Sequence, residues 1–313
     1  MALTGASGVV PEMLAERAAL LATLRDEMAA RGMLEVDTAL LSPAAPCERA
    51  LECLAVGGAG YLVPSPEHGL KRLLVETRRS LYQLGHVFRA GEVGRWHNPE
   101  FTMLEWYELG GSMQDAVDTL GTVLAAAGAP ALGRQRTYRA VFTDTLALDP
   151  LTASLDDLER CADAHGVTPP EARGDRVFWL DLLMGLVVQP RLGTQGPEIV
   201  THFPADDAVL IALDGDDARV GQRFECFWQG IELANGAKEL TDPRLARQRM
   251  QREQDVRIEQ GQAEPPIDER LLAAMATGLP ECAGVALGVD RLLALLTGKP
   301  RLAEVIPFAW PAR

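Results

Sequence analysis

Residues 88–109 read FRAGEVGRWHNPEFTMLEWYEL, and this stretch decides the fold. From Phe101 onward it alternates with the two-residue period of a β-strand, which places the side chains of Phe101, Glu105 and Tyr107 on one face. Residues 81–89 have similar aromatic and aliphatic content, so the two segments predict a long hairpin around a polar, glycine-containing loop. Arg89 enters this loop, where its guanidinium could hold a phosphate or simply pair with a nearby glutamate. The segment alone leaves both interpretations open.

Residues 224–235 predict a second hairpin, with Gln229-Gly230 as a two-residue turn. In this register Glu225 and Glu232 are diagonal neighbours on one face, and the other face is apolar. Two carboxylates that face inward from a buried sheet need a cation or protons, and magnesium is the usual cation where phosphates are handled. Two solvated carboxylates on an exposed face are the alternative. Asn235 and Glu239 just beyond favour a site.

Residues 284–295, GVALGVDRLLAL, predict a strand, a tight turn at Gly288 and a helix from Asp290. Gly288 permits a nucleotide to approach the backbone, and Arg291 lies near the helix N-terminus, where anions are favoured. A glycine-containing connection of this kind is also common for packing reasons alone. Chemistry and packing therefore both remain open here.

Two further helices are predicted nearer the start of the chain. Residues 13–31 have apolar side chains at helical spacing and are followed by a short strand through Val36. Ser65-Pro66-Glu67 is typical of a helix start, with Ser65 as N-cap. The basic pair Lys71-Arg72 in this helix is expected to lie on a solvated face.

Composition excludes several classes of protein. Thirty Lys and Arg against 44 Asp and Glu give a net charge of -14, which argues against a broad contact surface for a polyanion such as tRNA. The sequence has neither a signal peptide at its start nor an apolar segment of membrane-spanning length, so no membrane association is expected. The five cysteines show no zinc-type spacing and are interpreted as reduced thiols of a cytoplasmic protein.

Together these segments resemble the catalytic core of class II aminoacyl-tRNA synthetases, specifically the lysyl branch. Residues 88–109 are similar to motif 2, residues 284–295 to motif 3, and FECFWQGIELANGAKELTD, residues 224–242, to the lysyl-type segment between them. The resemblance implies an α+β fold whose mostly antiparallel sheet is flanked by helices. It also implies one catalytic domain over residues 1–313. Its motifs 1, 2 and 3 would lie at about 13–43, 81–109 and 284–297.

Motif 1 would begin almost at once, which leaves no room for the N-terminal anticodon-binding domain of lysyl-tRNA synthetases. Among stand-alone lysyl-like chains, this one most resembles the bacterial ligases that attach (R)-β-lysine to elongation factor P, and the stretches SPEHGLKRLLV (65–75) and HFPADDAVL (202–210) add to the resemblance. It implies a homodimer that uses ATP and Mg²⁺ to adenylate (R)-β-lysine, with elongation factor P as protein substrate. The alternatives are a truncated ligase that uses α-lysine with another acceptor, and a catalytically silent regulatory paralogue.

The resemblance also implies roles for individual residues. Arg89 would hold the α-phosphate and Arg291 the γ-phosphate, as the two catalytic residues. The ATP-binding set would be Arg89, Glu92, Asn98, Phe101, Glu232, Leu233, Gly288 and Arg291, with the Phe101 ring stacked on adenine. Glu225 and Glu232 would bind magnesium. The amino-acid pocket would comprise Ser65, Glu67, Glu105, Tyr107, Asn235, Glu239 and Ala286.

Three positions depart from the family pattern. Motif 2 often reads Arg-x-Glu, whereas Gly91 stands at that place and Glu92 follows it. Motif 1 usually has a proline where this chain has Ala39. Ala286 replaces the second glycine that motif 3 of lysyl-tRNA synthetases typically contains, and its methyl group would crowd an α-amino group while tolerating the shifted amine of β-lysine. One methyl group discriminates by about 1–3 kcal/mol, and packing explains the substitution equally well.

Overall fold

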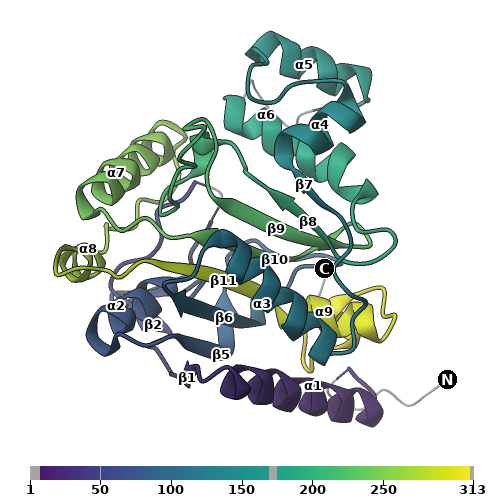
Figure 1. Cartoon of the computed structure of the whole chain (residues 1–313), viewed down its shortest axis with the longest axis vertical. Coiled ribbons are helices and arrows are strands. Elements are labelled where there is room, and N and C mark those ends of the chain that lie inside the picture. Colours follow the sequence, from purple (N-terminus) through teal and green to yellow (C-terminus); the bar gives the residue numbers. More distant parts are fainter. Residues whose placement is uncertain (1–7, 50, 169–174, 311–313) are drawn as a thin grey trace.

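The computed structural model describes residues 8–49, 51–168 and 175–310, and an eight-stranded sheet forms its centre (Figure 1). The strands run in the order β1-β5-β6-β11-β10-β9-β8-β7. Their bounds are β1 Leu34–Glu35, β5 Leu81–Phe88, β6 Glu100–Leu109, β11 Cys282–Gly288, β10 Ile231–Lys238, β9 Arg223–Trp228, β8 Glu198–Thr201 and β7 Gln135–Thr137. The outer pairs β1–β5 and β7–β8 are parallel, and the pairings between them are antiparallel. The predicted α+β fold with a mostly antiparallel sheet is confirmed.

Three helices cover one face of the sheet. They are α1 Pro11–Ala30, α3 Met113–Ala126 and α9 Val289–Leu296. Figure 1 shows α3 and α9 in front of the strands and α1 below them. Their apolar sides pack with Leu104 and Trp106 of β6 and Phe224 of β9 in the main core. Because these strand residues alternate with the predicted site residues, the site must lie on the opposite face.

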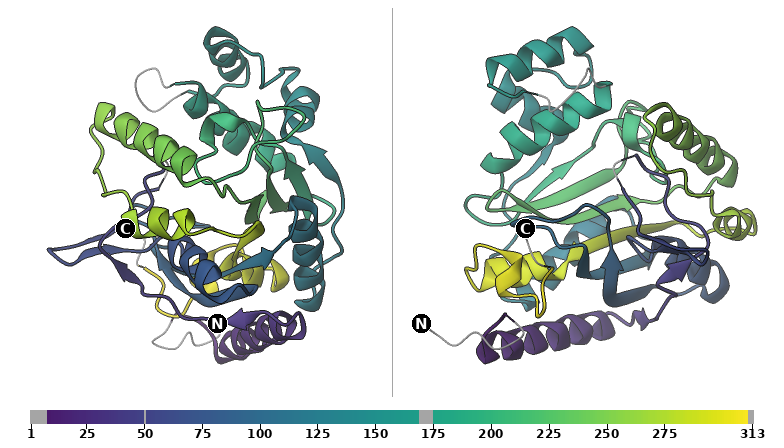
Figure 2. Two further views of the ribbon diagram at one scale, coloured as in Figure 1. Left: turned by 60° about the vertical axis from the view of Figure 1, so that its left-hand side comes forward. Right: turned by 180° about the vertical axis from the view of Figure 1, so that it is seen from behind.

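The opposite face, which the right-hand view of Figure 2 presents, has three other helices at its border. These are α2 Glu67–Thr77, α7 Pro243–Glu259 and α8 Glu269–Ala276. They form their own apolar cluster, which includes Tyr107 of β6 and Cys282 of β11. This cluster holds α2 and its first turn against the sheet.

Two smaller units complete the described chain. The helices α4 Tyr138–Leu146, α5 Leu155–Ala164 and α6 Arg176–Leu183, with a π-helix at Met184–Val188, form a separate apolar cluster beside β7 and β8 (Figure 1). The strands β2 Leu41–Ser42, β4 Gly60–Leu62 and β3 Ala55–Val56 form a three-stranded sheet. Among the described residues, no helix has both the length and the apolar character needed to cross a membrane.

Both predicted hairpins form, and the second has the predicted turn. Trp228 pairs with Ile231 across the turn, and Gln229 and Gly230 have φ angles of 52° and 74°. Positive φ at both central positions is the type I′ geometry, whose twist matches that of the flanking strands. The register therefore follows directly from the turn.

An irregularity in β10 changes which residues face the site. The register shifts between Glu232, which pairs with Phe227, and Ala234, which pairs with Cys226. This β-bulge leaves Leu233 as the extra residue, and both Leu233 and Ala234 belong to the main core. Glu232 and Asn235 consequently lie on the same face, although they are three residues apart.

The predicted start of α2 needs one correction. The residue that precedes the helix is Pro66, so Ser65 stands one position before the N-cap. Its hydroxyl nevertheless accepts a hydrogen bond from the backbone N–H of Glu67, at 3.0 Å. Proline has no N–H and a fixed φ, which suits it to this place in the chain.

Candidate active site

A cavity of about 440 Å³ lies on the sheet face opposite α3, and all site residues predicted from the sequence line it. The β6, β10 and β11 strands supply its floor, the loop between β5 and β6 one wall, and the start of α2 another. The predicted residues found there are Ser65, Glu67, Arg89, Glu92, Asn98, Phe101, Glu105, Tyr107, Glu225, Glu232, Leu233, Asn235, Glu239, Ala286, Gly288 and Arg291. A volume of this size suits a small-molecule site.

Small residues on β11 make room in the floor. Gly284, Ala286 and Gly288 alternate along the strand and line the cavity. A Cβ atom added to Gly284 would lie 2.7 Å from Oε1 of Glu239 and even closer to the Tyr107 ring. The space that glycine leaves is therefore what allows these two side chains to lie over the strand. Ala286 stands between Glu105 on one neighbouring strand and Asn235 on the other.

Carboxylates crowd the end of the cavity near α2. Glu105 is 3% exposed and accepts hydrogen bonds from the hydroxyls of Ser65 at 2.7 Å and Tyr107 at 2.8 Å. Burial, together with the charge of Glu67, raises the pKa of Glu105 to about 8. The carboxyl group is thus protonated at neutral pH until a cation arrives nearby.

Lys71 is buried at the same end. The prediction that the pair Lys71-Arg72 lies on a solvated face is therefore wrong for Lys71. Its side chain is 0% exposed, and its ammonium group is 2.5 Å from Glu67 Oε1 and 2.5 Å from Glu239 Oε2. Burial opposes the charge, but the two carboxylates outweigh it and raise the pKa of Lys71. Burial raises the pKa of Glu239 to about 7, against the opposing effect of Lys71.

Arg89 lines the cavity from the loop between β5 and β6. Its guanidinium carbon lies 5.2 Å from the centroid of the Phe101 ring, and its Nη1 lies 3.4 Å from Glu92 Oε1. Glu92 thus pairs with Arg89, although Gly91 occupies the usual glutamate position. The 3.4 Å separation is long for a charged hydrogen bond, so a phosphate can replace the carboxylate.

Arg291 comes from the first turn of α9 and reaches the other wall. It donates to the backbone oxygens of Trp96 at 3.2 Å and Glu232 at 2.9 Å. Its Nη1 is also 3.6 Å from the Glu232 carboxylate. These contacts hold the guanidinium at the cavity wall and join α9 to the loop between β5 and β6.

Asn98 lines the cavity, but its amide is occupied by the chain itself. The nitrogen donates to the Glu100 carbonyl at 2.5 Å, and the oxygen accepts from the Trp310 N–H at 2.8 Å. The side chain is 8% exposed. Asn98 therefore shapes the loop between β5 and β6 and fastens the end of the described chain to it.

The two carboxylates predicted as magnesium ligands face the same part of the cavity. Glu225 Oε1 is 2.5 Å from Arg223 Nη2, and its pKa is raised to about 8 by burial despite this arginine. Glu232 also contributes to the rise through charge repulsion. In the described part of the chain, no group of three or more His, Cys, Asp or Glu side chains is arranged to hold a metal ion. Two carboxylates are nevertheless the usual protein share of a magnesium site that also uses substrate phosphates.

Sequence reasoning missed several charged residues at the site, among them Arg223 and Lys71. Arg223 precedes Glu225 by two positions in β9, so strand alternation was the available signal. Lys71 follows Glu67 by four positions in α2, which is the spacing of a helical ion pair. Its contact with Glu239, far away in the sequence, had no local signal.

Comparison with known proteins identifies the family of the chain. A family model described as tRNA synthetases class II (D, K and N) matches residues 3–311. A protein of Proteus mirabilis named elongation factor P–(R)-beta-lysine ligase is 40% identical over 311 residues, which cover 94% of each chain. Proteins of the same name from Sodalis glossinidius and Vibrio cholerae are 42% and 39% identical over 310 and 311 residues, covering 95% of this chain and 94% and 95% of theirs. The chain therefore belongs to the class II tRNA synthetase family of the D, K and N type, and its relatives include proteins named elongation factor P–(R)-beta-lysine ligase.

Proposed function

We propose that this protein is an ATP-dependent ligase that adenylates (R)-β-lysine and transfers it to a lysine side chain of elongation factor P. The observation that carries the proposal is one cavity with two chemically different ends. Glu67, Glu105 and Glu239 make one end anionic, whereas at the other end Arg89 and Arg291 lie beside the carboxylates of Glu92 and Glu232. An amino acid with two ammonium groups fits the first end, and the phosphates of ATP fit the second.

The reaction needs no protein nucleophile. A carboxylate oxygen of the amino acid attacks the α-phosphorus of ATP, the bond to the β-phosphate oxygen breaks, and pyrophosphate leaves. The neutral amine of the acceptor lysine then attacks the acyl carbon, AMP leaves with the bonding electron pair, and an amide bond forms as the amine loses a proton. Arg89 would stabilise the charge on the α-phosphoryl oxygens and Arg291 that on the γ-phosphate. Phe101 would stack on adenine.

Glu225 and Glu232 would hold magnesium together with the phosphate oxygens. Carboxylate oxygens are the protein ligands that magnesium prefers, and both carboxylates line the cavity. When bound, the ion supplies electrostatic stabilisation of the phosphoryl charge. Asn98, Leu233 and Gly288 would shape the nucleotide end without charge, and Glu92 would contribute through its ion pair with Arg89.

Ala286 would select the isomer of lysine. Its methyl group lies on the cavity floor between Glu105 and Asn235, near the place where the backbone amine of the substrate must bind. In β-lysine this amine is one carbon farther from the carboxylate than in α-lysine. The preference from one methyl group is about 1–3 kcal/mol, roughly 5- to 150-fold in kcat/KM.

The proposal also covers the domain content, acceptor, location and oligomeric state of the enzyme. We propose one catalytic domain, no tRNA substrate, a cytoplasmic location and a homodimer built by the motif 1 segment. The net charge of -14 supports an acceptor other than a nucleic acid. Leu14 of α1 and Leu41 of β2, 42% and 43% exposed, offer apolar contact area within the motif 1 segment.

The decisive experiment is the intact mass of elongation factor P after incubation with this protein, ATP, magnesium and either (R)-β-lysine or α-lysine. A gain of one lysyl group with β-lysine, faster than with α-lysine, is expected. Faster reaction with α-lysine would support a lysyl ligase of different specificity. No gain with either isomer, together with no pyrophosphate exchange, would overturn the proposal in favour of a silent paralogue.

A further inference from the structure

Lys71 is a buried cation in contact with two of the carboxylates that line the cavity. It is 0% exposed and does not line the cavity, but its ammonium group bridges Glu67 and Glu239. Its nitrogen also lies 5.8 Å from the centroid of the Tyr107 ring. A fully buried lysine is rare, and it is retained only where its charge is paired.

The bridge uses one oxygen of each carboxylate. Lys71 contacts Oε1 of Glu67 and Oε2 of Glu239. Within the described ranges of the chain, the other oxygen of each accepts no hydrogen bond, and both residues line the cavity. The Glu239 oxygen that remains, Oε1, lies where Gly284 leaves open space. Lys71 therefore orients two carboxylates so that each presents one oxygen to a ligand.

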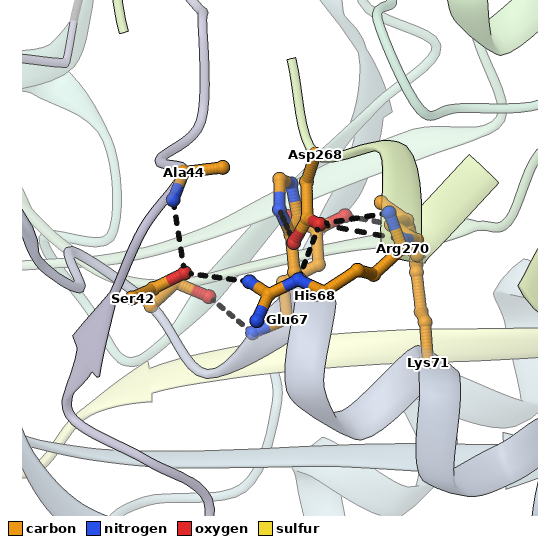
Figure 3. A network of polar contacts seen from close by, with 9 residues as sticks. Ser42, Ala44, Glu67, His68, Lys71, Asp268 and Arg270 are labelled. Carbon is orange, nitrogen blue, oxygen red and sulfur yellow. Dashed lines mark hydrogen bonds and ion pairs between the residues drawn. The ribbon is translucent and has the colours of Figure 1, made fainter. Parts of the chain in front are cut away.

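A second network of polar contacts connects the first turn of α2 to α8 and β2. Nδ1 of His68 lies 3.3 Å from Asp268 at the start of α8. Arg270 contacts Asp268 at 3.2 Å and donates to the Ser42 hydroxyl at 3.1 Å (Figure 3). Because this network ties α2 to α8 and β2, Glu67 and Lys71 are held in place without a substrate.

The charges at the anionic end of the cavity sum to zero when a substrate with two ammonium groups binds there. The anionic end has three carboxylates, those of Glu67, Glu105 and Glu239, and Lys71 supplies one positive charge. Two ammonium groups on the substrate complete the neutralisation, while Arg89 is available for its carboxylate. We propose that Lys71 is a positioning residue that acts as a built-in third cation and thereby selects substrates with two ammonium groups. This inference rests on the proposed function and specifies how its amino-acid pocket recognises the substrate.

The proposal predicts that substrate binding releases protons. In the empty cavity Glu105 and part of the Glu239 population are protonated at neutral pH, because burial raises their pKa values to about 8 and about 7. Two incoming ammonium groups favour the ionised forms of both carboxylates. The charged and titratable groups that face this cluster are Glu67, His68 and Lys71 from α2, Glu105 and Tyr107 from β6, Lys238 from β10, Glu239 directly after β10, and Cys282 from β11.

The test compares Lys71→Met with Arg72→Met, the same loss of charge at the next position of α2. Pyrophosphate exchange with (R)-β-lysine is measured from pH 6 to pH 9. Lys71→Met should raise KM at least 30-fold at pH 7 with kcat changed less than threefold, because the phosphate end is intact. The rise of kcat/KM with pH should also move upward by at least one pH unit, since the carboxylates lose the cation that lowers their pKa values. Arg72→Met should match the wild type.

Loss of activity by the same factor at every pH would assign Lys71 a purely structural role and overturn the inference. Thermal unfolding checks that Lys71→Met is folded. If Lys71→Met is not folded, the number of protons released when β-lysine binds to the wild-type protein is measured instead. Calorimetry at pH 7 in two buffers of different ionisation enthalpy gives this number. Release of about one proton or more supports the charge balance, and no release overturns it. A wild-type protein without any β-lysine-dependent exchange would refute the proposed function itself, which is a distinguishable failure.

Discussion

Replacing Glu105 by glutamine should stabilise the substrate-free protein at alkaline pH and weaken its binding of substrate. Burial raises the pKa of Glu105 from 4.5 to about 8. The folded state therefore binds this proton more tightly than the unfolded state does. Its contribution to stability is complete below about pH 4.5 and is lost as the pH rises through about 8. Glutamine stays neutral and can contact both hydroxyls, because its oxygen accepts from one of Ser65 and Tyr107 while its NH₂ group donates to the other.

The magnitude follows from the pKa shift. A shift of 3.5 units, from 4.5 to about 8, corresponds to about 5 kcal/mol. At pH 9 the free energy of unfolding of Glu105→Gln should exceed that of the wild type by about 3–5 kcal/mol more than it does at pH 5. Urea unfolding of the substrate-free proteins at the two pH values measures this difference. Glu76→Gln, on the exposed side of α2, is the matched control and should show no such difference.

The same variant has an expected kinetic effect. A hydrogen bond between an ammonium group and a carboxylate is worth about 1.5–3 kcal/mol, so KM for β-lysine should rise about 10- to 150-fold in pyrophosphate exchange. If the stabilities of Glu105→Gln and the wild type changed in parallel from pH 5 to pH 9, the buried carboxyl would be ionised throughout. The reasoning about the anionic end would then be refuted.

Three more substitutions test other parts of the cavity. Arg291→Ala removes a cation at the nucleotide end and should lower kcat/KM for ATP about 10²- to 10³-fold. The loss of its two hydrogen bonds to backbone oxygens should lower the thermal stability as well, so folding is checked by thermal unfolding; an effect on kcat/KM below threefold would exclude the γ-phosphate role. Ala286→Gly should shift the ratio of kcat/KM for α-lysine over β-lysine upward by about 5- to 150-fold, and an unchanged ratio would assign the methyl group to packing. Gly284→Ala puts a methyl group against Tyr107 and Glu239, so unfolding should cost about 1–3 kcal/mol less and β-lysine binding should weaken. A fully stable, active variant would contradict the close packing seen there.

Much of the site could be predicted from short segments because strand alternation is a local property. The face shared by Phe101, Glu105 and Tyr107 follows from a period of two within one strand, and the structure confirms it. The pairing of Trp228 with Ile231 follows from the type I′ turn between them. The roles of these residues toward ATP and the amino acid stay predictions.

Other features had no local signal. Alternation from Glu232 would place Asn235 on the opposite face, and only the bulge at Leu233 returns it to the cavity. The pattern of residues 231–235 does not predict this bulge, because apolar side chains are buried both in the regular register and in the shifted one. Lys71 was expected on a solvated face, and this was wrong because its second carboxylate partner, Glu239, follows β10 and is far away in the sequence.

By itself, the sequence determined the strands and helices of the motifs, the turn of the second hairpin and the resemblance to the family, because these depend on residues that are close together in the chain. Only the tertiary structure decided which charges meet. The ammonium group of Lys71 and the carboxylates of Glu67, Glu105 and Glu239 come from three separate elements. Their protonation depends on burial and on mutual distance, and both exist only once the sheet has assembled and α2 has packed against it.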